Sequence, residues 1–381
     1  MAVEPREHPH CRFLQDDDLP QSLYERARKA TLDRRVRVAK PLLDSLRAHG
    51  VAGVFIDPER VLVSSSSRNS RKGTALYHAH LSDEAFETIA KSLAEGVGVA
   101  ATARIQGVDK KTVLLVLAKA AEHAEKITRT LLVNLVVSEC QLDEMWSFVG
   151  KKEKNLEPLE KLQGELGDAW IWIAFDAVSK VVIARVVGKR TLPHAVSLLE
   201  EVKRVTARMP TLFSSDQLSQ YLNALLQAYG RMVRPPRKPG PGRPPMPRLV
   251  PPEDLLYVQV VKECKKGRVV KVSRKVVFGN PETIDHVLDR STVSKTINTS
   301  YVERNNGTIR HRDARCTRKT LRFSKSMENH QRQLTLTLAY YHLCRPHRSL
   351  SKRHGTPTTP FMAGDLTDHP WTMGELLAAR A

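Results

Sequence analysis

Three acidic residues, Asp143, Asp216 and Glu303, occupy positions that suggest a functional role for their carboxylates. Asp143 lies inside an apolar segment typical of a strand, where an unpaired carboxylate would be costly to bury. Asp216 ends a short apolar segment, and functional sites gather at strand ends in α/β sheets. Glu303 begins a helical segment at 301–312. Any one of these acids alone could cap a helix or form a salt bridge, so only their convergence would indicate a site.

Converging carboxylates repel one another, and a bound cation relieves that repulsion. Hard oxygen ligands select Mg²⁺ or Mn²⁺. Two such ions, roughly 3.5–4 Å apart, can activate the attacking oxygen and stabilise the leaving oxygen of an in-line phosphodiester displacement. We expect two ions, with Asp143 bridging both, Asp216 completing one site and Glu303 the other.

The elements that must position these acids have the period of strands from about residue 135. The expected order is three strands, a helix, a fourth strand and a helix, at 136–150, the two halves of 170–188, 193–208, 211–216 and 217–230. This is the order of a ribonuclease-H-like domain, in which the first and fourth strands are neighbours. The order alone is a weak signal, since many α/β domains share it.

Two further carboxylates compete for the same role. We expect Asp176 to shape the turn between the two strands of 170–188. We expect Glu144 to lie on the sheet face opposite Asp143, because side chains alternate along a strand. Neither is included in the predicted triad.

Ahead of the strands, residues 74–130 predict an all-α domain. Helices are expected at 81–96, 99–107 and 110–126, with Asp109 as the N-cap of the last. A glycine-bearing turn between the last two helices is typical of a helix-turn-helix. Its second helix would present Lys110, Lys111 and Thr112 to DNA. A plain structural bundle is the alternative.

An insertion is expected at 231–298 inside the strand-bearing region. Residues 231–252 hold nine prolines, six Lys or Arg and no acid, which predicts an extended basic connector. Arg243 stands in a Gly-Arg-Pro core similar to an AT-hook, whose arginine enters a narrow minor groove, although a stiff, sequence-indifferent basic spacer is the favoured interpretation. Residues 255–279 predict a hairpin turning near Lys266–Gly267.

Charge favours nucleic acid as the partner. The 381 residues carry a net charge of +20 and a pI near 9.9, and such a field attracts polyanions. Five scattered cysteines indicate neither disulfides nor a zinc ribbon. No signal peptide is evident and the apolar runs are too short to span a bilayer, so we expect a soluble, cytoplasmic, nucleoid-associated protein without a membrane partner.

The sequence resembles the insertion-sequence-one transposases, a family of DDE transposases. The motif DE-x-W at 143–146 and the motif N-T-x-x-x-E-R-x-N at 298–306 are specific, and further similar segments follow in order from about 74 to 377. The resemblance implies an α/β fold, a ribonuclease-H-like mixed sheet with flanking helices, preceded by the helix-turn-helix domain. The catalytic domain would span 135–350, and 351–381 would be a C-terminal tail.

The resemblance also implies a catalytic and metal-binding triad of Asp143, Asp216 and Glu303, with Arg304 and Asn306 supporting the Glu303 helix. Residues 301–353 carry thirteen Lys or Arg and three acids. We expect further contacts with double-stranded DNA at Arg304, Asn306, Arg310, Arg312, Arg315, Arg318, Lys319 and Arg322. Family members often carry an N-terminal CxxC…CxxC zinc ribbon. Residues 1–73 have only Cys11 near His8 and His10, so the ribbon is expected to be absent or decayed.

The function expected from these features is metal-dependent strand cleavage followed by 3′-OH strand transfer at the ends of an insertion sequence. Two DNA ends must be held together, so a homodimer or higher oligomer is expected. A silent or domesticated transposase acting as a DNA-binding regulator is the alternative, and a simple nuclease is a third. A tyrosine or serine recombinase fits less well, because its covalent nucleophile needs no acid triad.

Overall fold

The computed structural model describes residues 11–13, 51–56, 61–65, 71–236 and 245–380. The chain divides into two units, Met1–Lys72 and Gly73–Ala381. In the first, β1 (Cys11–Phe13), β2 (Val51–Ile56) and β3 (Val61–Ser65) form an antiparallel sheet in the order β1-β3-β2. The question of metal binding at Cys11, His8 and His10 lies outside what is described. Among the described residues, no helix is long and apolar enough to cross a membrane.

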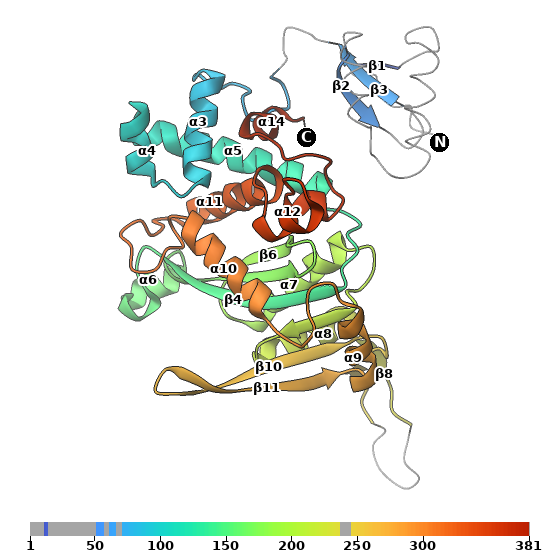
Figure 1. The fold of residues 1–381 in the computed structure, drawn as a ribbon. Coiled ribbons are helices and arrows are strands. Elements are labelled where there is room, and N and C mark those ends of the chain that lie inside the picture. The colour runs from blue at the N-terminus through green and yellow to red at the C-terminus, as the bar shows by residue number, and fades with distance from the viewer. Residues whose placement is uncertain (1–10, 14–50, 57–60, 66–70, 237–244, 381) are drawn as a thin grey trace. The chain divides into compact units, whose positions relative to one another are not determined.

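The second unit is built around a six-stranded mixed sheet of order β11-β10-β7-β4-β5-β6 (Figure 1). Only the pairs β4–β7 and β7–β10 are parallel. The strands are β4 (Glu139–Val149), β5 (Gly167–Asp176), β6 (Val182–Gly188), β7 (Leu212–Ser215), β10 (Tyr257–Lys265) and β11 (Arg268–Phe278). The expected strands are therefore confirmed, and the first and fourth of them, β4 and β7, are neighbours.

Helices cover both faces of this sheet because the strands alternate apolar side chains between them. Leu142 and Trp172 pack with α7 (Leu192–Val205) and α8 (Ser219–Tyr229). Met145 packs on the other face with α10 (Ser300–Arg312) and α11 (Met327–Ala339). This mixed sheet between helices is consistent with a ribonuclease-H-like fold.

The three predicted N-terminal helices are α3 (Asp83–Ala94), α4 (Val99–Gln106) and α5 (Lys110–Leu131). Asp109 caps α5 as expected, since its carboxylate accepts from Lys111 N at 2.7 Å. Gly107 ends α4 with φ 63°, a left-handed conformation that glycine adopts without strain. α5 packs along α11, and the two share one core with the sheet (Figure 1).

The expected C-terminal tail is part of this unit. Residues 348–378 form α12 (Arg348–His354), α13 (Pro360–Ala363) and α14 (Met373–Ala378). Met373, Leu376 and Leu377 of α14 are buried in the core, and Leu377 O accepts from Ala75 N at 3.0 Å. These helices are too short to show a helical period in the sequence, which is why the segment was expected as a tail.

Other elements lie inside the expected insertion and in the loops. Residues 231–233 and 248–250 pair as β8 (Arg231–Val233) and β9 (Arg248–Val250), so the ends of the proline-rich connector form a small ladder of their own. Arg243 lies outside the described residues. The predicted hairpin is confirmed as β10–β11. Four further elements were not expected from the sequence: η1 (Glu153–Asn155), α6 (Pro158–Gln163), α9 (Pro281–Arg290) and the π-helical turn η2 (Tyr340–Cys344).

Candidate active site

Asp143 and Asp216 lie side by side because of the register between β4 and β7. The parallel ladder pairs Gln141 with Ser214, so continuing it by two residues brings Asp143 level with Asp216. β7 ends at Ser215, and the chain then turns away with Asp216 Oδ1 accepting from Leu218 N at 3.0 Å. The sheet hydrogen bonding of β4 on this side therefore stops just before the acids, which leaves their side chains beside an open edge.

Glu144 joins the same group. Carboxylate oxygens of Asp143, Glu144 and Asp216 all lie within 4.8 Å of one another. Glu144 does face α8, where it accepts from Tyr221 Oη at 3.0 Å, while Asp143 faces α10. The expectation that Glu144 lies on the face opposite Asp143 is therefore confirmed. The carboxylates of the two acids nevertheless meet, because β7 ends at Ser215 and the longer Glu144 side chain reaches around the edge of β4 that this leaves open.

Glu303 lies in the first turn of α10, as expected, but outside this group of three. Its Oε1 accepts from Thr299 Oγ1 at 2.7 Å and also binds Lys262 Nζ of β10. Its charge still contributes to raising the pKa of Asp143. In this arrangement a lysine neutralises Glu303, and a divalent ion at the cluster would take over that role.

Gln141, which the sequence analysis missed, attaches the start of α10 to β4. Its Oε1 accepts from the backbone N–H groups of Tyr301 and Val302, at 3.1 and 2.9 Å, and its Nε2 donates to Asn298 O at 3.0 Å. These bonds satisfy two of the unpaired donors at the helix N-terminus. They fix Glu303 relative to the strand that carries Asp143. No spacing rule in the sequence would have singled out this glutamine.

Asn306 ties α10 to the cluster directly. Its Nδ2 donates to Asp143 Oδ2 at 2.7 Å, while its Oδ1 is buried without a hydrogen-bond partner. One helical turn before it, Glu303 lies on the same side of α10, since residues three apart are neighbours on a helix. Asn306 is buried at this point and links α10 to β4.

The electrostatics of the group fit a metal cation. Burial and the charges of Glu144 and Asp216 raise the pKa of Asp143 to about 7. Burial and Asp216 also raise the pKa of Glu144, although Arg190 opposes the shift. Carboxylate repulsion in a partly buried site is relieved by a bound cation, and an all-oxygen donor set suits Mg²⁺ or Mn²⁺. The residues present therefore fit a divalent ion.

The basic residues expected to contact DNA fall into two groups. Lys110, Lys111, Arg304, Arg318, Lys319 and Arg322 are exposed. Arg312 is instead buried against Glu95, at 2.9 Å, where it joins α10 to α3. Arg310 is half-buried and donates to Cys316 O and Trp146 O, at 3.2 and 3.0 Å. Arg315 donates to Ser324 Oγ at 3.1 Å, and Thr112 is half-buried. The inner arginines hold the loop after α10 in place.

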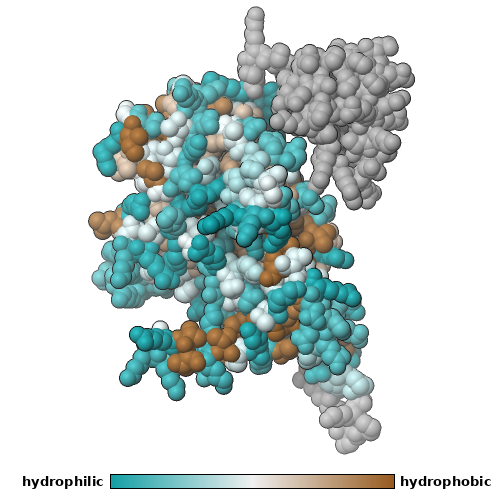
Figure 2. Space-filling model, in the orientation of Figure 1, coloured by the Kyte–Doolittle hydropathy of each residue, from teal (hydrophilic) through white to brown (hydrophobic). Residues whose placement is uncertain are grey.

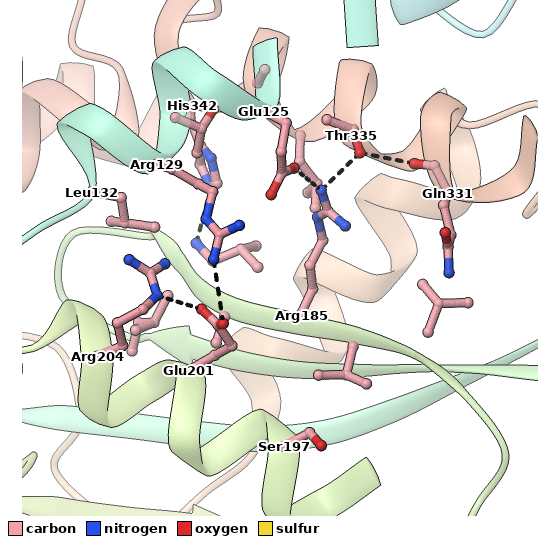
Figure 3. Close-up of a pocket in the computed structure, with 18 of the residues that line it drawn as sticks. Glu125, Arg129, Leu132, Arg185, Ser197, Glu201, Arg204, Gln331, Thr335 and His342 are labelled. Atoms are coloured by element: carbon pink, nitrogen blue, oxygen red, sulfur yellow. Dashed lines mark hydrogen bonds and ion pairs between the residues drawn. The ribbon is translucent and has the colours of Figure 1, made fainter. Parts of the chain in front are cut away.

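A separate cleft of about 640 Å³ lies between α5, β6, α7 and α11 (Figure 3). Arg185 extends into it and donates to Glu125 Oε2 at 2.6 Å and Thr335 Oγ1 at 2.7 Å. Glu201 pairs there with Arg129 and Arg204, at 3.8 and 2.7 Å. These five charged groups pair with one another, and among the described residues no three acids converge here as they do at Asp143.

Comparison with known families adds independent information. Residues 280–343 match the family model described as IS1 transposase. The match covers α9, α10, α11 and most of η2, and so includes Glu303 and Asn306, whereas Asp143 and Asp216 lie outside it. No curated protein matches the chain. The resemblance inferred from the sequence is therefore confirmed for residues 280–343.

Proposed function

The chain carries an IS1 transposase domain at residues 280–343, and from that premise we propose that it cleaves DNA strands and joins the freed 3′-OH ends to target DNA. A single observation carries the proposal: Asp143, Glu144 and Asp216 bring carboxylate oxygens within 4.8 Å of one another beside the matched helix that bears Glu303. We take the catalytic unit to be a ribonuclease-H-like domain at 135–350 and α3–α5 to be a helix-turn-helix at 74–130.

In this proposal each residue has a defined part. Asp143 and Asp216 hold the metal site on two adjacent strands, and Glu303 completes it from α10 once released from Lys262. Glu144 lends a fourth carboxylate, kept in place by Arg190 and Tyr221. Mg²⁺ or Mn²⁺ bound there would activate the attacking oxygen and stabilise the leaving oxygen of the displacement.

The reaction balances without a covalent protein intermediate. In the cleavage step a water oxygen forms a bond to the phosphorus as the bond to the 3′ oxygen breaks, and that oxygen leaves as a 3′-OH. In the transfer step this 3′-OH oxygen bonds to a target phosphorus, and the displaced target strand leaves with its own 3′-OH. A protein nucleophile of the recombinase kind is not required.

DNA contacts are proposed along the exposed basic residues. Lys110, Lys111 and Thr112 begin α5, where a recognition helix meets base edges. Arg304, Arg318, Lys319 and Arg322 would neutralise phosphates near the acids, and Arg310, Arg312 and Arg315 would support them. A homodimer or higher oligomer would hold two DNA ends together. A role for Arg243 remains part of this proposal, as does association with the nucleoid.

The alternative function is that of a DNA-binding regulator without catalysis. The two are separated by assaying cleavage and strand transfer on duplexes that carry candidate element ends, with Mg²⁺ or Mn²⁺. Asp143→Asn, Asp216→Asn and Glu303→Gln remove one charge each without changing side-chain volume. Asp368→Asn, an exposed acid paired with His369, is the matched control.

Loss of both reactions in the three variants, with DNA binding kept and the control active, supports the enzyme. A parent chain that binds DNA but neither cuts nor joins it supports the regulator. Cleavage without joining would point to a simple nuclease. Activity that survives all three substitutions would show that other acids carry the chemistry.

A further inference from the structure

Four aromatic side chains form a strip on the α8-facing side of the sheet, beyond the end of that helix. Trp146 and Trp170 are direct cross-strand partners on β4 and β5. Trp146 stacks on Phe148, with ring centroids 5.6 Å apart, and Phe148 contacts Phe323 at 4.8 Å. We call Trp146, Phe148, Trp170 and Phe323 the aromatic strip.

Side chains on this face become less buried from Leu142 and Trp172 toward the aromatic strip. Leu142 and Trp172 are fully buried, and the Trp172 ring meets Tyr221 of α8 edge-on. The rings further along the same face, on Trp146, Trp170 and Phe148, are each only partly buried. The helices therefore cover the beginning of the face, and beyond it each aromatic side chain keeps part of its surface in contact with solvent.

Cationic side chains lie beside all four rings of the aromatic strip. The Arg190 guanidinium lies 4.8 Å from the Trp170 ring centroid. Lys152 Nζ lies 5.7 Å from the Trp146 ring centroid and 5.9 Å from that of Phe148. Lys325 Nζ lies 3.1 Å from the Phe323 ring centroid. Positive charges held beside aromatic rings are the combination that single-stranded nucleic acids bind.

The strip begins at the acidic cluster. Arg190, which covers Trp170, also donates from Nε to Glu144 Oε1 at 2.9 Å. Glu144 and Trp146 are two residues apart on one strand, so their side chains lie on the same face about 7 Å apart. A strand whose phosphate reaches the carboxylates would therefore pass directly over the tryptophans.

At its other end the strip leads into a basic cleft. A cleft of about 600 Å³ opens between α4, the start of α5 and the loop that follows α10, and Phe323 lines it. Its lining includes five cationic side chains and no carboxylate: Arg104, Lys110, Arg315, Arg322 and Lys325. The remaining lining is largely apolar, including Leu114 and Leu321. The positive charge of the cleft would attract the phosphates of a nucleic acid, and its apolar lining would suit the bases.

We propose that the aromatic strip and the basic cleft bind a single-stranded stretch of DNA that adjoins the scissile phosphate. Unpaired bases would stack on the strip, and their phosphates would meet the cations that accompany it and line the cleft. A duplex conceals its base faces, so the strip distinguishes unpaired from paired DNA. The inference rests on the proposed function, since it names the state of the DNA that the acidic cluster acts on.

The test measures binding of the full chain to fluorescent oligonucleotides by anisotropy, in EDTA so that nothing is cleaved. A single strand about 12 nucleotides long, within the range that single-strand sites cover, is compared with the duplex of the same sequence. Phe323→Ala and Trp146→Leu each remove one stacking surface. We expect the single-strand Kd to rise about tenfold or more in each, as loss of one stacked base predicts. The duplex Kd should change by less than about twofold, because it depends on phosphate contacts elsewhere.

One control matches the chemistry of the substitutions. Tyr77→Ala removes an exposed aromatic ring outside the strip. Phe323 lies in a loop, so its variant tests the proposal even if Trp146→Leu fails to fold. Equal weakening of single strand and duplex, or no change in either, would overturn the proposal. Dissociation of an oligomer with unchanged DNA affinity would do so too, since the strip would then be a protein interface.

Cleavage assays keep this result separate from the proposed function. If the acid variants abolish cleavage but the strip variants bind single strands normally, the further inference fails alone. If the strip variants lose single-strand binding while the parent chain shows no cleavage, binding of single-stranded DNA by the strip is supported and the enzymatic proposal fails.

Discussion

Asn306 of α10 donates from Nδ2 to Asp143 Oδ2 of β4 at 2.7 Å, which joins two elements 163 residues apart in sequence. The bond occupies one oxygen of Asp143, in a carboxylate that lies within 4.8 Å of those of Glu144 and Asp216. Because Glu303 lies one turn earlier on the same helix, this contact also sets the separation between the strand acids and the helix acid. The geometry of the candidate site therefore depends on a residue that is not itself a carboxylate.

Asn306→Ala should lower the strand-cleavage rate by about 10- to 100-fold and raise the Mg²⁺ concentration needed for half-maximal rate, as loss of a partner to a metal ligand does. Asn305→Ala is the matched control, because Asn305 is buried next to it without any hydrogen-bond partner. Cleavage rates measured across a Mg²⁺ titration would distinguish them. Equal effects from both substitutions would mean that Asn306 acts only through packing.

Glu144→Gln should weaken Mn²⁺ binding about tenfold, measured by titration calorimetry on the full chain without DNA. The reason is that its carboxylate lies within 4.8 Å of the oxygens of Asp143 and Asp216. Asp176→Asn is the comparison variant, since Asp176 accepts from Val178 N and Ser179 N at 3.1 Å and holds the turn after β5. Asp176→Asn should lower stability and leave Mn²⁺ affinity as it was. Unchanged affinity in Glu144→Gln would mean that Glu144 serves only as the partner of Arg190 and Tyr221.

Glu125→Ala should reduce the free energy of unfolding by about 1–2 kcal/mol, because it leaves the partly buried Arg185 without its carboxylate partner. The side chains are 22% and 44% exposed for Arg185 and Glu125, so solvent screens part of the interaction. Glu122→Ala, which breaks the exposed pair with Lys126, should cost less than about 0.5 kcal/mol. Urea unfolding of both variants measures the difference. Equal costs would contradict a special role for Arg185.

Acid should destabilise the protein through buried histidines. Burial lowers the pKa of His330 to about 4 and that of His342 to about 3. Val182 N donates to His342 Nε2 at 3.0 Å, so a proton on that nitrogen would break the bond. Both imidazoles have a pKa near 6.5 in an unfolded chain.

Below about pH 6.5 the unfolded state therefore binds protons that the folded state does not. The free energy of unfolding should fall as pH falls from about 6.5 to about 4, by up to about 1.4 kcal/mol per pH unit for each histidine. Urea unfolding at several pH values checks this, with His330→Gln reducing the slope and the exposed His311→Gln leaving it unchanged. A slope unaffected by His330→Gln would contradict the assignment.

The local elements and the chemical class of the site could be predicted from the sequence alone. Apolar periods of two and 3.6 residues placed the strands and the principal helices, and Asp109 and Gly107 marked helix ends because capping depends on neighbouring residues only. The same patterns placed Asp143 within a strand, Asp216 at a strand end and Glu303 at a helix start, where the structure has them.

Which of these groups lie in contact depends on the tertiary structure, because elements distant in sequence bring them together. Glu144 joins the cluster because β7 ends at Ser215. The alternation of side chains within β4 gives no information about where a neighbouring strand ends. Gln141 and Asn306 acquire their roles from contacts with partners about 160 residues away. The packing of α14 into the core has the same origin, since a six-residue helix carries too little pattern and gains its stability from the surface it covers.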